Sequence, residues 1–175
     1  PDIYGGDELI DLLAGYRVSH AFITPAALAS ASHRELPDLV TLGVGGEASP
    51  PDLVARWAPG RRYLNCYGPT ETTIVATMSE PLTPGTPVTI GTPIEQCTAL
   101  VLDHRSAPVP DHVPGELYLA GPQLARGYHG QPGLTAARFV PNPFDADGAR
   151  MYRTGDLVRW NASGALEYLG DAAHD

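Results

Sequence analysis

The chain has 175 residues, of which 43% are hydrophobic and 18% charged, a composition typical of a folded globular protein rather than a disordered segment. Its formal net charge of −9 argues against nucleic acid as a partner, because phosphate contacts need clustered positive charge. The 11 basic residues are all arginine, and the chain contains no lysine. No run of about 18 apolar residues occurs, so we expect no membrane span. Two cysteines without metal-type spacing favour a reducing, cytoplasmic setting.

Helix and strand patterns alternate up to about residue 80. Apolar positions at helical spacing predict a helix over Asp7–Arg17, and shorter helices should begin at Thr24-Pro25 and after Pro50-Pro51. Apolar runs predict three strands, over Val18–Ile23, Leu39–Val44 and Tyr63–Tyr67. Strands of this length separated by helices predict a parallel α/β layer, in which ligands bind at the carboxyl ends of the strands.

The second half of the chain, residues 81–175, has a different character. Proline and glycine interrupt its first part, and only Leu134–Phe139 has a helical pattern. Short strands are predicted over Thr98–Leu102, Glu116–Leu119, Asp156–Trp160 and Leu166–Leu169. Asn161–Gly164 is predicted to form a hairpin loop. The sequence therefore predicts an α/β fold class: a partial parallel α/β subdomain over residues 1–80, followed by a mostly β subdomain.

Three strings contain the residue types of a nucleotide site. Asn65–Glu71 follows a predicted strand and combines an aromatic ring, a Gly-Pro turn, a hydroxyl and a carboxylate. These groups could supply a face for a base, close backbone approach, a phosphate donor and a metal ligand. A tight turn leaving a buried strand would explain this string alone equally well. The other two strings are Gly115–Tyr128 and Tyr152–Leu157.

Together with Gly164–Gly170, these strings resemble the adenylation domains of nonribosomal peptide synthetases, within the adenylate-forming superfamily. They occur in the family's order and at compatible spacing, and the likeness runs along essentially the whole chain. Leu124–Tyr128, followed by Leu134-Thr135 and Arg138-Phe139, is more similar to amino-acid-activating members than to acyl-CoA ligases. The resemblance implies a flavodoxin-like portion and then a distorted, barrel-like subdomain.

The implied reaction is carboxylate activation. An amino acid carboxylate attacks the α-phosphorus of ATP, with Mg²⁺ as the metal, and gives an aminoacyl-adenylate and pyrophosphate. The acyl group then passes to the phosphopantetheine thiol of a peptidyl carrier domain. Two alternatives stay open: an acyl- or aryl-CoA ligase of the same superfamily, and a noncatalytic nucleotide-binding fragment.

The resemblance assigns roles within the first string. Tyr67 matches the aromatic residue that stacks on adenine, and Asn65 matches the amide near the amino edge of the base. Thr70 matches the phosphate-contacting hydroxyl and Glu71 the Mg²⁺ carboxylate, so these two are the catalytic candidates. A tyrosine packed at a strand end would explain Tyr67 without a ligand, and a helix start would explain Thr70-Glu71.

Further nucleotide contacts are implied outside that string. Gly45 and Gly46 would let the backbone approach the other face of adenine, or they form a plain turn at a strand end. Asp156 matches the acceptor of the ribose hydroxyls. Tyr168 matches a second ribose-side contact, or it pairs across a hairpin.

The family's side-chain-lining positions fall on Phe22, Gly43, Gly45, Cys66, Ile74 and Val75. This set contains no charge and little bulk apart from Phe22. A charged substrate side chain would be left unpaired there, so the pocket suits an aliphatic amino acid of leucine, isoleucine or valine size. The same positions could also be core residues of the α/β layer.

The resemblance covers only the middle of the family's chain. The lysine-bearing phosphate loop would lie before residue 1, and the small lid subdomain with a second lysine would lie after residue 175. Asp171 and Ala173 stand where the family has an arginine and the hinge aspartate. We therefore expect these residues to need the missing amino- and carboxy-terminal parts and to show no appreciable adenylation alone. Glu116 and Arg126 are interpreted as structural, in an ion pair or a loop anchor.

Overall fold

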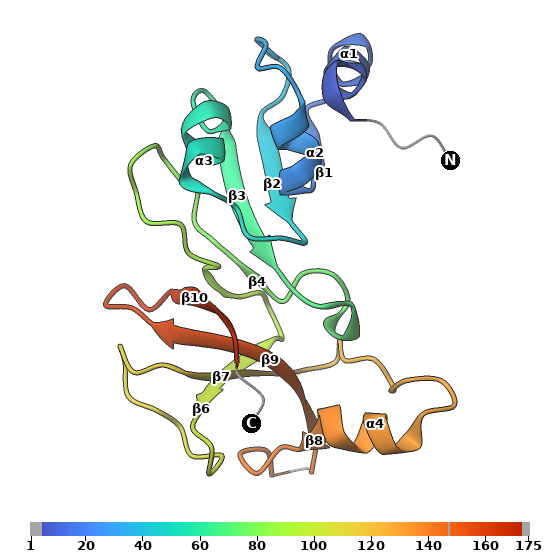
Figure 1. Ribbon diagram of the computed structural model, residues 1–175, viewed down its shortest axis with the longest axis vertical. Coiled ribbons are helices and arrows are strands. Elements are labelled where there is room, and N and C mark those ends of the chain that lie inside the picture. Colours follow the sequence, from blue (N-terminus) through green and yellow to red (C-terminus); the bar gives the residue numbers. More distant parts are fainter. Residues whose placement is uncertain (1–4, 147, 173–175) are drawn as a thin grey trace. The chain divides into compact units, whose positions relative to one another are not determined.

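The computed structural model describes residues 5–146 and 148–172 (Figure 1). It divides into two compact units, one formed by Pro1–Tyr67 and Ser79–Val88 and the other by Gly68–Met78 and Thr89–Asp175. The subdomain boundary expected after residue 80 stays a prediction. Within the described ranges, no helix combines the length and the apolar character that a bilayer crossing requires.

The first unit is a three-stranded parallel sheet with three helices. The helices are α1 (Gly6–Gly15), α2 (Pro25–Ser30) and α3 (Pro51–Trp57), and the strands are β1 (His20–Ile23), β2 (Thr41–Gly45) and β3 (Arg62–Tyr67). Strand β2 lies between β1 and β3 and pairs with both in parallel. Each of these elements was predicted. Strand β2 begins two residues later than expected because the amides of Val40 and Thr41 both donate to the Ser19 carbonyl.

Local sequence explains where the short helices begin. The hydroxyl of Thr24 accepts a hydrogen bond from the Ala27 amide at 3.3 Å, which satisfies one of the free donors of the first turn of α2. Pro25 and Pro51 stand in the first turns of α2 and α3, where a missing amide costs nothing and the fixed φ angle suits a helix.

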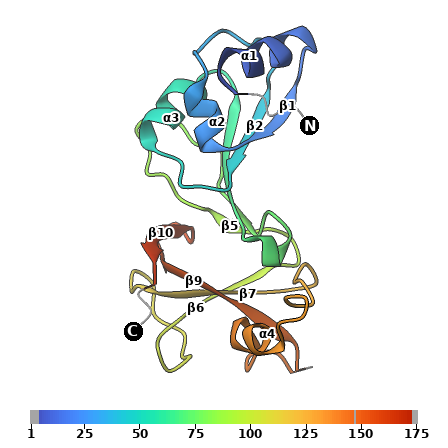
Figure 2. The same cartoon turned by 45° about the vertical axis from the view of Figure 1, so that its right-hand side comes forward.

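The core of the first unit lies between the helices and one face of the sheet (Figure 2). Leu28 of α2 and Trp57 of α3 are fully buried, as are Leu42 and Val44 of β2. Because successive strand residues point to opposite faces, Gly43 and Gly45 belong to the other face. The sheet therefore presents a helix-covered face and a second face that has no side chain at these two positions of β2.

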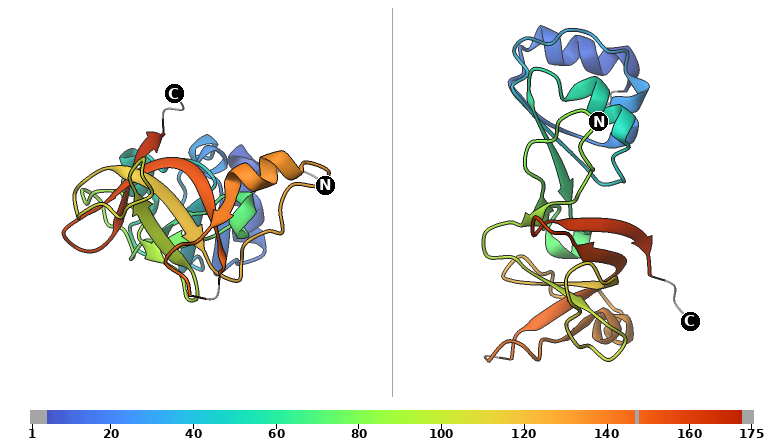
Figure 3. Two further views of the ribbon diagram at one scale, coloured as in Figure 1. Left: turned by 90° about the horizontal axis from the view of Figure 1, so that it is seen from below. Right: turned by 90° about the vertical axis from the view of Figure 1, so that its left-hand side faces the viewer.

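The second unit is mainly an antiparallel sheet in the order β10-β9-β7-β6, with β8 also paired to β9 (Figure 3). Its strands are β6 (Thr98–Leu102), β7 (Gly115–Ala120), β8 (Phe139–Pro141), β9 (Arg150–Trp160) and β10 (Leu166–Asp171). It also contains the 3-10 turn η1 (Thr70–Thr72), the helix α4 (Pro132–Arg138), and the short antiparallel pair β4 (Thr77–Met78) and β5 (Thr92–Pro93).

The predicted fold class is confirmed: a parallel α/β layer is followed by a mostly β unit. Strands β4, β5 and β8 were missed because two or three residues are too few to show an alternating pattern. The first half of β9 was missed as well. Gly155 adopts a φ of 83° within this strand, and the pairing of β7 with β9 shifts register between Glu116 and Tyr118. These irregularities break the alternation that marks a strand.

Candidate functional site

Four of the predicted pocket residues meet at the carboxyl end of the parallel sheet. In the strand register Phe22 pairs with Gly43, and Gly45 pairs with Cys66. A Cβ atom built on Gly43 would lie 3.0 Å from Cδ2 of Phe22 and 3.7 Å from Sγ of Cys66. The Phe22 ring and the Cys66 thiol therefore border the space above the two glycines.

Gly43, Gly45 and Cys66 are buried, as their alternative interpretation as core residues expects, so their role in a substrate pocket stays a prediction. The packed core of the first unit lies on the opposite face of the sheet, and Phe22 is 51% exposed. Cys66 is buried, and burial raises the pKa of its thiol, so the group stays neutral. An exposed ring, two glycines and a neutral thiol form an apolar, uncharged surface.

The glycines of β2 are required by close packing and by backbone conformation. A Cβ atom on Gly45 would lie 2.4 Å from the Cys66 carbonyl oxygen, and none can fit without moving the backbone. Gly46 has a φ of 94°, which side-chain-bearing residues rarely adopt. Close packing at Gly45 and the backbone conformation of Gly46 therefore explain why both positions are glycine. Their contact with adenine stays a prediction.

Asn65 and Tyr67 lie on β3, near the end of the parallel sheet. Asn65 is buried, and its backbone bonds twice with Ser79: its amide donates to the Ser79 hydroxyl at 2.8 Å, and its carbonyl accepts from the Ser79 amide at 2.9 Å. Tyr67 is the last residue of β3 and is half-buried. The strand end that bears both residues is held firmly, whereas their roles toward adenine stay predictions.

In the second unit, Thr70 and Glu71 begin the single 3-10 turn η1. The helix start expected from Thr70-Glu71 is therefore one tight turn rather than an α-helix. Thr70 is exposed, and the hydroxyl of Thr72 donates to the Pro69 carbonyl at 3.1 Å. A Cβ atom on Gly68 would lie 2.6 Å from the Ile74 carbonyl oxygen, so the Gly-Pro pair allows the chain to fold tightly onto itself.

The predicted pocket residues Ile74 and Val75 follow η1 in a strained segment. Thr73 and Ile74 have φ angles of 59° and 70°, unusual for β-branched residues, and the Val75 amide closes the turn on the Thr73 carbonyl at 2.8 Å. Such a conformation costs about 1–3 kcal/mol per residue and needs support from its surroundings. The hydroxyl of Thr73 supplies part of it by donating to the Gln123 carbonyl at 2.7 Å. The Ile74 side chain is left 66% exposed.

Glu71 is the meeting point of the three sequence strings. The Tyr128 hydroxyl, at the end of the second string, donates to Oε1 of Glu71 at 2.5 Å. The Tyr152 hydroxyl, at the start of the third string, lies 3.4 Å from that of Tyr128. Sequence reasoning did not assign either tyrosine to the site, although both are the aromatic residues that end or begin a string.

The electrostatics of this cluster favour an ionised Glu71. Burial raises the pKa of the Glu71 carboxyl. The hydrogen bond from Tyr128, together with Tyr152 and Arg138, lowers it by more, so the pKa lies below its usual value. Burial and the nearby Glu71 raise the pKa values of Tyr128 and Tyr152, so both phenols keep their protons at neutral pH. A carboxylate of this kind, half-buried and ionised, has the chemistry of a Mg²⁺ ligand.

The pattern Leu124–Tyr128, Leu134-Thr135 and Arg138-Phe139 has a structural explanation. The hydroxyl of Thr135 accepts the Tyr128 amide at 2.9 Å, and the ring of Phe139 meets that of Tyr128 edge-on at a centroid distance of 5.7 Å. Gly127 has a φ of 143°, and a Cβ atom there would lie 2.4 Å from Cγ2 of Thr135. The spacing therefore fixes the backbone and the ring of Tyr128.

The structural interpretation of Glu116 is confirmed. Arg153 donates through Nε and a terminal nitrogen to both carboxylate oxygens of Glu116, at 2.8 and 2.9 Å, which joins β7 to β9. Arg126 anchors its loop through its carbonyl, which accepts from the Arg150 guanidinium at 3.1 Å.

The two predicted ribose contacts come close together on the β9–β10 hairpin. Asp156 is paired with Asp171 in the register, and the Tyr168 hydroxyl donates to Oδ1 of Asp171 at 3.0 Å. Burial, the hydrogen bond to Asp171 and the charge of Asp156 raise the pKa of Tyr168 to about 12. Tyr168 pairs with Val158 across the hairpin, as its alternative interpretation expects, and its contact with ribose stays a prediction. Ala173 lies outside the described residues.

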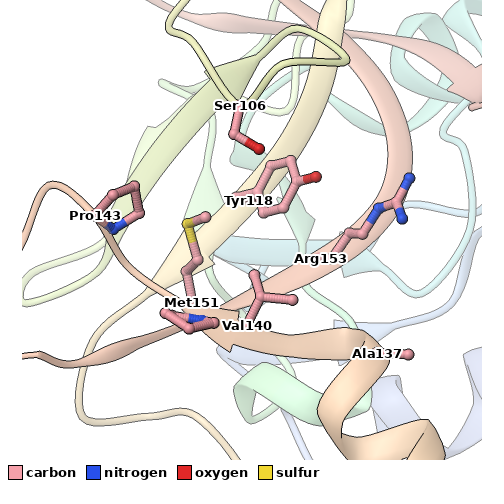
Figure 4. A pocket seen from close by; sticks show the side chains of 8 residues that line it. Ser106, Tyr118, Ala137, Val140, Pro143, Met151 and Arg153 are labelled. Carbon is pink, nitrogen blue, oxygen red and sulfur yellow. The ribbon is translucent and has the colours of Figure 1, made fainter.

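A separate cavity of about 360 Å³ lies on the antiparallel sheet (Figure 4). It is lined by Ser106, Tyr118, Ala137, Val140, Pro141, Pro143, Met151 and Arg153. Tyr118 and Arg153 both contact Glu116, so the single cationic group of this lining is already paired with a carboxylate. None of the predicted site residues borders this cavity.

Comparisons with known proteins agree with this architecture. Residues 3–129 match the family model of the AMP-binding enzyme. The chain is 53% identical over 169 residues to Novobiocin biosynthesis protein H of Streptomyces niveus, covering 97% of the chain and 28% of that protein. It is 54% identical over 160 residues to Isonitrile lipopeptide synthase of Mycobacterium tuberculosis, covering 91% of the chain and 6% of that protein.

Among solved structures, the chain superimposes on PA1221, a nonribosomal peptide synthetase protein containing adenylation and PCP domains. The TM-score is 0.85 at 27% identity, over 94% of this chain and 35% of that one. The chain thus spans a small part of the proteins it matches. It belongs to the AMP-binding enzyme family, as part of an adenylation domain of the kind found in nonribosomal peptide synthetases.

Proposed function

We propose that these residues supply the nucleotide and substrate contacts of a domain that activates an amino acid with ATP and passes it to a carrier-bound phosphopantetheine. The observation that carries this proposal is the ionised Glu71 carboxylate, held by Tyr128 on the turn that immediately follows β3. Adenylate formation depends chiefly on neutralising phosphate charge and positioning the reactants, and an anionic metal ligand held in a fixed position suits both needs.

The nucleotide contacts are proposed by matching position and chemistry. Asn65, Tyr67, Gly45 and Gly46 would meet adenine, Thr70 would contact phosphate, and Asp156 and Tyr168 would meet the ribose. Glu71 would hold Mg²⁺, which in such sites is bound by one or two carboxylates together with phosphate oxygens. Mg²⁺ bound there would neutralise charge on the phosphates.

An aliphatic substrate is proposed from the six pocket positions, Phe22, Gly43, Gly45, Cys66, Ile74 and Val75. Support comes from the Phe22 ring and the Cys66 thiol around the two glycines, since neither can pair with a substrate charge. Burying a charged side chain on such a surface would be costly. Leucine, isoleucine and valine fit this chemistry.

A peptidyl carrier domain is the proposed acceptor, by analogy with PA1221, which contains adenylation and PCP domains. The chemistry also needs cationic groups beyond those of this chain, which has arginine but no lysine. The amino- and carboxy-terminal parts of an adenylation domain would supply them, and a cytoplasmic setting would supply ATP and the reduced thiol. Residues 1–175 alone are proposed to be inactive.

Pyrophosphate exchange by the full-length protein that contains these residues tests the proposal. Aliphatic amino acids should support ATP–pyrophosphate exchange, whereas lysine, glutamate, fatty acids and aryl acids should not. Glu71→Gln should lower the exchange rate at least 100-fold, since it removes the ionised carboxylate. Glu167→Gln, which removes a partly exposed ion pair between β9 and β10, is the matched control. Exchange with fatty or aryl acids alone would instead establish an acyl- or aryl-CoA ligase.

A further inference from the structure

The hydroxyl groups of Tyr128 and Tyr152 form a chain that ends at the Glu71 carboxylate. Because Tyr128 donates its single proton to Glu71 at 2.5 Å, its oxygen is left as an acceptor for the Tyr152 hydroxyl at 3.4 Å. Hydrogen bonds in such a series polarise and strengthen one another. Tyr152 therefore supports Glu71 through Tyr128, in addition to its own interaction with the carboxylate.

Both tyrosine rings are fixed by the same phenylalanine. Phe139 is buried, and its ring lies 5.7 Å from the Tyr128 ring and 5.1 Å from the Tyr152 ring, measured between centroids. The guanidinium of Arg150 lies 5.3 Å from the Phe139 ring. The positions of the hydroxyls consequently depend on packing within the antiparallel sheet rather than on a mobile side chain.

The backbone around Tyr128 is held from two further directions. The Ala125 amide donates to the Glu71 carbonyl at 2.8 Å, so the loop and η1 are joined by main chain as well as by side chains. The Arg150 guanidinium donates to the carbonyls of Ala125 and Arg126 at 3.3 and 3.1 Å. All of these contacts limit the movement of Tyr128 relative to Glu71.

A carboxylate has about four lone-pair sites, so one hydrogen bond on Oε1 leaves acceptor capacity for a metal ion. Groups that hydrogen-bond to a metal ligand orient it, and their loss typically weakens metal affinity about 10- to 100-fold. We infer that Tyr128, backed by Tyr152, is a positioning residue that orients the Glu71 carboxylate for a divalent cation. This inference rests on the proposed function, in which Glu71 is the metal ligand.

Phenylalanine substitutions isolate the hydroxyl groups, because they keep the rings packed on Phe139. Tyr118→Phe is the matched control: Tyr118 is a buried tyrosine of the same sheet whose hydroxyl also donates to a carboxylate, that of Glu116, at 3.4 Å. The probe is Mn²⁺, added to the full-length protein with ATP and without amino acid. The free ion is measured by electron paramagnetic resonance, which requires no turnover.

We expect Tyr128→Phe to raise the dissociation constant for Mn²⁺ about tenfold. Tyr152→Phe should raise it less, because Tyr152 lies farther along the chain of hydroxyls. The double variant should raise it by less than the two single effects combined, because Tyr152 acts in part through Tyr128. Tyr118→Phe should leave the constant unchanged. In pyrophosphate exchange, the Mg²⁺ concentration for half-maximal rate should rise for Tyr128→Phe, and saturating Mg²⁺ should restore most of the rate.

Three outcomes separate the ways in which the inference can fail. If Glu71→Ala leaves the Mn²⁺ constant unchanged, the proposed metal role of Glu71 is wrong. If Glu71→Ala weakens Mn²⁺ binding and Tyr128→Phe does not, only the positioning role is wrong. If Tyr128→Phe strengthens Mn²⁺ binding, its hydroxyl competes with the metal, which also overturns the inference. Hydrogen exchange of the Ala125 and Tyr128 amides would reveal a variant that has merely loosened the loop.

Discussion

The parallel and antiparallel units build their candidate contacts by opposite means. In the parallel unit, the predicted positions stand where the sheet lacks side chains: Gly43 and Gly45 leave space that Phe22 and Cys66 border. In the antiparallel unit, predicted groups are held by side chains, as Glu71 is by Tyr128 and Tyr168 is by Asp171. One unit relies on close backbone approach and the other on charge-assisted hydrogen bonds.

This difference has a consequence for mutagenesis. Substitutions in the parallel unit should act through volume, with effects that do not depend on pH or salt. Substitutions in the antiparallel unit should act through hydrogen bonds and charge, with effects that do. Each of the following four variants, made in the full-length protein, tests this distinction.

The largest effect is expected for Gly45→Ala. Its new Cβ atom would lie 2.4 Å from the Cys66 carbonyl oxygen, so β2 and β3 would have to separate. We expect the free energy of opening of the β2–β3 amides, measured by hydrogen exchange, to fall by about 3 kcal/mol. Gly15→Ala, at a helix end with open space around its Cβ position, should change it by less than about 1 kcal/mol. Equal effects of the two variants would refute the volume argument.

Gly43→Ala should alter substrate choice more than stability. Its Cβ atom would lie 3.0 Å from Cδ2 of Phe22, which is closer than ordinary van der Waals contact, so the Phe22 ring would have to shift slightly. The new methyl group would also occupy space proposed for the substrate. We expect the ratio of kcat/KM for leucine to that for alanine, in pyrophosphate exchange, to fall about 10- to 100-fold. Cys66→Ala, which enlarges the same surface, should move the ratio in the opposite direction. An unchanged ratio in both variants would place the substrate elsewhere.

Glu116→Gln tests the charge-based stability of the second unit. The Glu116 carboxylate accepts two hydrogen bonds from Arg153, whose side chain is partly exposed, so solvent reduces the strength of the pair. We expect the free energy of opening of the β7–β9 amides, measured by hydrogen exchange, to fall by about 1–2 kcal/mol. Glu167→Gln removes the single, more exposed bond to Arg159 and should cost less. The reverse order would mean that burial does not strengthen these pairs.

The smallest effect concerns the pKa of Tyr168, which burial and Asp171 raise from 10.0 to about 12. Because the folded-state value is above the unfolded one, the stabilisation is complete below pH 10 and is lost as pH rises through about 12. Asp171→Asn should lower the pKa of Tyr168 part of the way back. Carbon NMR of labelled tyrosine rings, with Tyr168→Phe for assignment, would measure it. A pKa that stays at about 12 in Asp171→Asn would show that burial and the charge of Asp156 are responsible without Asp171.

Much of the fold followed from local sequence. Helices with a proline in the first turn and apolar strands were predicted correctly in the first unit, because their patterns depend on neighbours within one turn or one strand. The same reasoning located β6, β7 and β10 in the second unit. It failed for β8 and the first half of β9, whose strand character comes from pairing with each other and, for β9, with β7.

The candidate site residues could also be predicted, since their types and spacing match a family pattern. Their hydrogen-bond partners could not be predicted. Tyr128 and Glu71 are 57 residues apart in the chain, and nothing in the periodicity of either string indicates the bond between them. Glu116 was expected to form an ion pair, but its partner Arg153 follows from the register of β7 on β9.

Residue type and short-range spacing were enough to predict most helices and longer strands, the uncharged candidate pocket residues and the string that ends in Glu71. The three-dimensional fold was needed to show that the Phe22 ring lies against the glycines of β2 and that two tyrosines form a chain of hydroxyls to Glu71. Such contacts join segments that are distant along the chain. Their geometry depends on strand register and ring packing, which no local pattern encodes.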